Sequence, residues 1–97
     1  MATCYFSVWL SNGGVALGPV EQEGAITIGA GSTQGAVITG ASNHQRTVRL
    51  FCDSNAFVTW GTDPTAASDG SAGMPMGAEN PEYVQVSSGD RFAVIAR

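Results

Sequence analysis

Apolar and polar residues alternate along several short stretches of this chain, the pattern of strands that bury one face. In the stretches 2–10 and 46–52 the even positions are the more apolar, and successive side chains of a strand point to opposite sides. We therefore expect the even positions to face a core: Cys4, Phe6, Val8, Leu10, Val48, Leu50 and Cys52. The odd positions, which include Tyr5 and Trp9, face the other way.

Turn-forming residues separate these stretches from other short apolar ones. Gly18 and Pro19 are predicted to end one strand, and the turn at 53–55 is predicted to make a hairpin of 46–52 and the strand after it. The further strands are expected at 15–17, 25–28, 36–39, 56–60, 83–87 and 91–97, with loops at 29–35 and 40–45. Seven or eight short antiparallel strands without a helical pattern predict an all-β fold, a small β-sandwich or jelly roll, in one domain over residues 1–97.

A long segment, 62–80, interrupts this series of strands. Loops of that length are uncommon in compact domains and tend to be functional or disordered. The segment carries Met74, Pro75 and Met76, and flexible methionine side chains on a surface suit adaptable contacts. We predict these three as protein-interface residues; the alternative is that the segment folds back and caps the sandwich.

Composition narrows the possible partners. Charged residues make up only 12% of the 97 residues, the net charge is −4, and lysine is absent. Nucleic-acid binding needs clustered basic residues, so we expect none. No stretch approaches the roughly 20 apolar residues of a membrane span, and residues 1–5 lack the pattern of a signal peptide, so we expect no membrane partner. A surface this poor in charge suits a protein packed against neighbours, including copies of itself.

Residues that could carry chemistry are few. His44, the single histidine, lies in a polar stretch and cannot supply a multi-histidine metal site. Cys4 and Cys52 are predicted as buried free thiols, with one disulfide as the alternative. Asp69 precedes a glycine as in some calcium loops, but the alternating acidic pattern is missing. We therefore predict no cofactor, no metal and no enzymatic activity.

The two tryptophans leave a choice open. Trp9 and Trp60 are predicted to pack in a core or an interface. The alternative is that they form a stacking platform, which would make the chain a small carbohydrate-binding module.

The second half of the chain shows the following order of strands and turns: VRLFCD at 48–53, AFVTWG at 56–61, DPTA at 63–66, MPM at 74–76, PE at 81–82 and GDRFAVI at 89–95. This order resembles that of small virion proteins encoded near the capsid genes of tailed bacteriophages. The resemblance covers about half of the chain and implies a capsid decoration, or cement, protein.

Such proteins are compact β-folds, often trimers, that bind the major capsid protein on the outside of the head and clamp neighbouring coat subunits. The resemblance thus implies a homo-oligomer made in the host cytoplasm and located on the virion. Many modest interfaces would act together through symmetry. The alternative within the same class is a component of the phage neck or tail.

Overall fold

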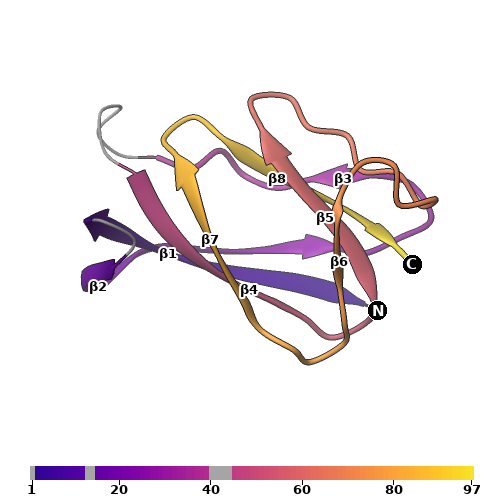
Figure 1. The fold of residues 1–97 in the computed structure, drawn as a ribbon, viewed down its shortest axis with the longest axis horizontal. Helices are drawn as coiled ribbons and strands as arrows, with labels where there is room; N and C mark the ends of the chain where they lie inside the picture. Colours follow the sequence, from indigo (N-terminus) through magenta and orange to yellow (C-terminus); the bar gives the residue numbers. More distant parts are fainter. Residues whose placement is uncertain (1, 13–14, 40–44) are drawn as a thin grey trace.

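Two antiparallel sheets face each other in this protein (Figure 1). The computed structural model describes residues 2–12, 15–39 and 45–97, which form eight strands. The first sheet has the order β2-β1-β4-β7, and its strands are Val15–Thr27, Thr3–Asn12, Gln45–Cys52 and Glu82–Ser87. The second sheet has the order β3-β8-β5-β6, and its strands are Thr33–Gln34, Arg91–Ala96, Ala56–Gly61 and Met74–Met76. The predicted all-β sandwich is confirmed.

The strand pairs are nested as in a jelly roll. The innermost pair is β5–β6, the next is β4–β7 and the next is β3–β8, and these pairs lie alternately in the second and the first sheet. In a jelly roll the next pair outward would join β2 to a strand that follows β8 in the sequence. In this protein β1 takes the place of that strand and lies between β2 and β4.

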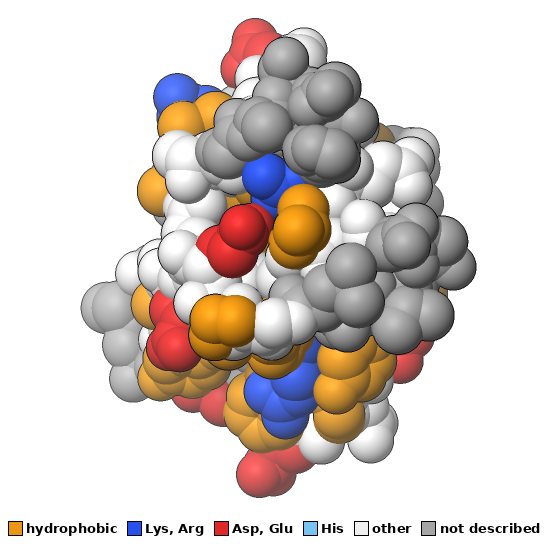
Figure 2. Space-filling view, turned by 90° about the vertical axis from the view of Figure 1, so that its left-hand side faces the viewer, with side chains coloured by type: hydrophobic (Ala, Val, Ile, Leu, Met, Phe, Trp, Pro, Cys, Tyr) orange, Lys and Arg blue, Asp and Glu red, His pale blue; other side chains and the backbone are white. Residues whose placement is uncertain are grey.

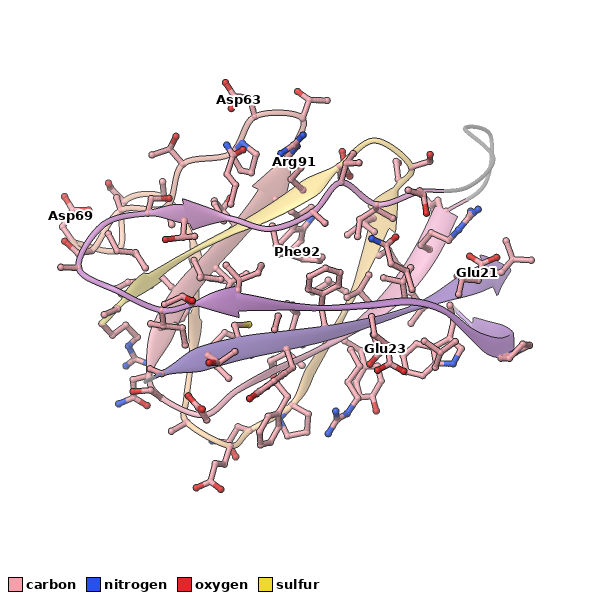
Figure 3. The ribbon with its side chains drawn as sticks, turned by 180° about the vertical axis from the view of Figure 1, so that it is seen from behind. Glu21, Glu23, Asp63, Asp69, Arg91 and Phe92 are labelled. Atoms are coloured by element: carbon pink, nitrogen blue, oxygen red, sulfur yellow. The ribbon has the colours of Figure 1, made fainter. Side chains whose placement is uncertain are left out.

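The core lies between the sheets and confirms the alternation predicted for 2–10 and 46–52. Cys4, Phe6 and Val8 are buried, as are Val48, Leu50 and Cys52 from β4, whereas Leu10 is only partly buried. From the other side Phe92 reaches into the space between the sheets (Figure 3), with its ring centroid 5.7 Å from that of Phe6 and 5.9 Å from that of Trp60. Burying one such aromatic side chain stabilises the fold by about 1.5–3 kcal/mol.

The strand β2 differs from its prediction. It runs without interruption from 15 to 27 through Gly18 and Pro19, where we predicted an end. Val8 pairs with Gln22 but Leu10 pairs with Leu17, so β2 bulges between these positions. The bulge accommodates Gly18, whose φ is +70°, and proline is tolerated because β2 is an edge strand.

The segment between β2 and β4 also corrects the prediction. The strand expected at 36–39 is not formed; Ile38 is buried, its N–H donates to the carbonyl of Asp90 and its carbonyl accepts from Gly89 (both 2.8 Å). The predicted loop 29–35 contains the short strand β3. Residues 40–44, which include His44, lie outside the described residues.

The predicted hairpin of β4 and β5 is wrong, because the two strands belong to different sheets. The turn between them is stabilised by hydrogen bonds from other parts of the chain. The N–H of Thr3 donates to Asp53 Oδ1 (2.7 Å), and the N–H of Ala78 donates to Asn55 Oδ1 (2.8 Å). The predicted turn at 88–90 is present and likewise joins strands of different sheets. Within the described residues, no helix has the length and apolar character needed to cross a membrane.

Candidate functional site

The predicted contact residues Met74, Pro75 and Met76 form β6, an edge strand paired with β5. Met76 is fully buried in the core and Met74 is partly buried against it, whereas Pro75 is exposed. Met76 is thus not available as a surface contact, because strand pairing turns it toward the interior. The alternative, in which the segment folds back onto the sandwich, describes Met76 correctly.

The preceding part of the long segment covers the outer face of the second sheet. Ala66 is buried there with Ala93 and Ile95, and Phe57 packs against this cluster. Hydrogen bonds tie the segment down: Ser32 Oγ accepts from the N–H of Ala66 (3.0 Å), and Gln34 Nε2 donates to Asp63 Oδ1 (2.9 Å) and to the carbonyl of Pro64 (2.8 Å). The apolar outer side of this sheet is therefore filled by the chain itself.

The outer face of the first sheet is different, because within the described residues its aromatic side chains are left in contact with solvent. The outward positions of β1, β4 and β7 place Tyr5 opposite Phe51 and Arg49 opposite Tyr83. Directly opposed side chains on one face lie about 4.5–5.5 Å apart at Cβ, so the four form one continuous surface. Trp9 lies further along β1, beyond Ser7. We call this surface the aromatic face and define it by Tyr5, Trp9, Arg49, Phe51 and Tyr83.

The aromatic face is exposed but ordered by its own contacts. Tyr83 is 65% exposed and Tyr5 is 48% exposed, the two highest values among the large hydrophobic residues of the described chain. The guanidinium carbon of Arg49 lies 5.4 Å from the ring centroid of Phe51, a cation–π contact. Figure 2 shows hydrophobic side chains on both sides of an arginine in its lower part. The contact with Phe51 therefore orients the Arg49 side chain before any partner binds.

Polar residues border the aromatic face on two sides. Next to Trp9, Gln85 Nε2 donates to Thr47 Oγ1 (2.8 Å), and the hydroxyl of Ser11 donates to Gln85 Oε1 (2.9 Å). On the β2 side, Glu23 is opposite Ser7 and points away from the interior (Figure 3). Protein interfaces commonly have a centre of aromatic residues and arginine surrounded by a rim of hydrogen-bonding residues, and the aromatic face has this composition.

The two tryptophans do not form the joint platform considered above. Trp9 lies on the outer side of the first sheet, whereas Trp60 belongs to the second sheet and packs against the core beside Phe92. A saccharide could not stack on both rings at once.

The two cysteines are free thiols and both are fully buried, which confirms the first of the two alternatives. They are direct partners across β1 and β4. The hydrogen bond with Cys52, together with burial, raises the pKa of the Cys4 thiol well above its usual range. The same bond lowers the pKa of Cys52, because the Cys4 proton favours a thiolate on its neighbour.

Asp69 is a turn residue. Its Oδ1 accepts a hydrogen bond from the N–H of Ser71 (2.9 Å), and bonds from Ser71 lower the pKa of this fully exposed carboxyl. Among the described residues, no three histidine, cysteine, aspartate or glutamate side chains gather as a metal site would require.

Comparison of the chain with protein-family models, with curated proteins and with solved structures finds no match. Sequence reasoning assigned Tyr5 and Trp9 to an outward face but did not combine them with Phe51 and Tyr83. The usable signal was that aromatic residues recur at outward positions in three separate predicted strands.

Proposed function

We propose that this protein is a structural binding protein that docks through the aromatic face, and that it is a capsid decoration protein of a tailed bacteriophage. Its partner is the major capsid protein on the outside of the head, and it acts as a homo-oligomer, with a trimer favoured. The observation that carries the proposal is the contrast between the two sheets. Within the described residues, the chain covers the outer side of the second sheet but leaves Tyr5 and Tyr83 of the aromatic face exposed.

The composition of the aromatic face supports a protein partner. Tyrosine, tryptophan and arginine are the residues that most often dominate binding energy in protein interfaces. Tyr5, Tyr83 and Arg49 are presented on a sheet, so little conformational entropy is lost when they bind. Only 12% of the residues are charged, which agrees with a protein whose surface is in contact with neighbouring proteins.

The mechanism follows from repetition. One docked copy makes one modest interface, but a symmetric shell offers the same docking surface many times. An oligomer that engages several coat subunits at once gains affinity because its later contacts form within the same complex. Each bound oligomer then holds those subunits together.

The first test is the copy number of the protein in purified virions of the phage that encodes it, measured by quantitative mass spectrometry against the major capsid protein. A number comparable to that of the coat protein supports the decoration role. A handful of copies per virion would assign the protein to the neck or tail instead, and absence from virions would refute both assignments.

The second test concerns the aromatic face itself. Tyr83→Ala and Arg49→Ala should each weaken binding to expanded heads about tenfold or more, since interface residues of these types commonly contribute over 1 kcal/mol. Val37→Ala is the matched control, because Val37 is an exposed hydrophobic residue (37%) outside the aromatic face. Equal binding by all three variants would show that another surface docks.

A second candidate function uses the same face for a carbohydrate, with Trp9 and Tyr5 as stacking rings. Its motivating observation is that both residues occupy outward positions of the same strand, β1. Sugars should then quench tryptophan emission, and Trp9→Phe should abolish the quenching while Trp60 remains in place. Unchanged emission across a panel of sugars would dismiss this candidate.

A further inference from the structure

Cys4 and Cys52 occupy a special kind of position in the first sheet. The N–H of Asp53 donates to the carbonyl of Thr3 (3.0 Å), so residues 3 and 53 form a hydrogen-bonded pair of β1 and β4. Hydrogen-bonded and non-hydrogen-bonded pairs alternate along antiparallel strands. Cys4 and Cys52, the next pair along, are therefore a non-hydrogen-bonded pair, in which the Cα atoms come closest.

That spacing is compatible with a covalent bond. Cα atoms of a non-hydrogen-bonded pair are about 4.5 Å apart, and disulfides span Cα separations of about 4.4–6.8 Å. Both side chains point to the same side of the sheet, into the core, and each is 0% exposed. The two residues are direct cross-strand partners within the same buried core. The pairing therefore meets the Cα spacing that a disulfide requires.

We propose that Cys4 and Cys52 are a latent disulfide site that links β1 to β4 when the protein meets an oxidising thiol–disulfide environment. The oxidant is a small-molecule disulfide such as oxidised glutathione. The Cys52 thiolate attacks one sulfur of the oxidant and releases one glutathione thiolate. The Cys4 sulfur then displaces the second glutathione, so that one S–S bond has formed, one has broken, and the two protons of the cysteines end on the two released thiols.

Access determines when this happens. The pair is buried, but it lies at the beginning of β1 and the end of β4, where loss of a few terminal hydrogen bonds opens the sheet. Oxidation is therefore slow in the folded protein and fast during folding. The bond would close a ring over residues 4–52, which includes all of β2 and β3. Because β1 and β4 carry four of the five residues of the aromatic face, the bond would also restrain the two strands that present that face.

The test is to refold the purified full-length protein in a buffer with a high ratio of oxidised to reduced glutathione, next to a sample kept in excess reductant. Intact mass and a peptide map give the state of each cysteine, and thermal melting followed by circular dichroism gives stability. The expected product has no covalent link between chains, has lost two hydrogens per chain, carries no glutathione, and melts about 10–20 °C higher than the reduced protein.

Single variants provide the control. Cys4→Ala and Cys52→Ala should each keep one thiol or carry one glutathione, and oxidant should not raise their melting temperatures. If these variants fold poorly, the comparison of oxidised and reduced wild-type protein still decides. The proposal would be overturned by wild-type protein that retains both thiols, that carries a glutathione on each cysteine, that links covalently between chains, or that melts at a lower temperature after the internal bond has formed.

Discussion

Gly24 in β2 offers a direct test of how the core is packed. It is paired with Phe6 of β1, and the Phe6 ring lies over its Cα on the inner side of the sheet. A Cβ added at Gly24 would lie 2.3 Å from Cζ of Phe6 and 2.5 Å from Cε1. Ordinary carbon–carbon contacts are about 3.5–4.0 Å, so Gly24→Ala requires the ring to move by roughly 1 Å or more.

The ring has little room for that movement. Phe6 is 2% exposed, and its centroid is 5.7 Å from that of Phe92, so displacement compresses the centre of the core. Overpacking of this kind costs about 1–3 kcal/mol. Alanine also raises the free energy of unfolding by roughly 0.5–1 kcal/mol, because it restricts the unfolded chain more than glycine does. The net loss is about 1–2 kcal/mol, which lowers the melting temperature by roughly 5–15 °C in a domain of this size.

Thermal melting followed by circular dichroism measures this loss. Gly29→Ala is the matched control, because nothing lies within 4 Å of a Cβ at that position, and it should melt at or slightly above the wild-type temperature. Replacing Phe6 by leucine in the Gly24→Ala background should recover part of the loss relative to the two single changes. A Gly24→Ala protein that melts together with the Gly29→Ala protein would refute this account of the core.

Three further predictions concern other parts of the molecule. Arg46 is 2% exposed, and its Nε lies 2.8 Å from Oε1 of Glu21, which is 41% exposed. Glu21→Gln should therefore lower the free energy of unfolding by about 1–2 kcal/mol in urea titrations. An unchanged midpoint of urea unfolding would contradict this. Hydrogen bonds from Ser71 lower the pKa of Asp69, so an NMR titration should place the pKa of this carboxyl below 3.8. The stability that the carboxylate contributes is present above pH 3.8 and disappears as the pH falls through its folded-state pKa. Ser71→Ala should raise the pKa of Asp69 toward 3.8. Pro75 lies in the edge strand β6 and has no N–H to offer to a further strand, so Pro75→Val should form larger assemblies than the wild type in concentrated solution while the melting temperature barely changes. A variant with the same assembly size as the wild type would count against this role for the proline.

The alternation of residues along the chain was sufficient to predict the class of fold and much of the core. In β4 it identified Val48, Leu50 and Cys52 as buried because one face of that strand meets the opposite sheet. Local periodicity contains no information about which strand pairs with which. The turn residues at 53–55 predict that the chain reverses direction. The next strand can then pair with β4 in a hairpin or cross to the other sheet, and the turn residues alone do not distinguish the two.

The candidate site was less predictable for a related reason. An apolar residue in a long segment can lie on the surface or in the core, and pairing with β5 decides this for Met76. The aromatic face needs the register of three strands that are far apart in sequence. Tyr5, Phe51 and Tyr83 become neighbours only when that register is known.

The place of β1 in the first sheet has a consequence for how the chain could be connected. Both chain ends reach the turn after β4: Thr3 accepts a hydrogen bond from Asp53, and the N–H of Arg97 donates to the carbonyl of Asn55 (3.3 Å). Figure 1 shows the two ends beside each other. A circular permutant that joins these ends and opens the chain between β1 and β2 would therefore keep every strand in place. In that permutant β1 would follow β8, and its pairing with β2 would change from the most local contact of the sheet to the most distant, so the same structure should form more slowly.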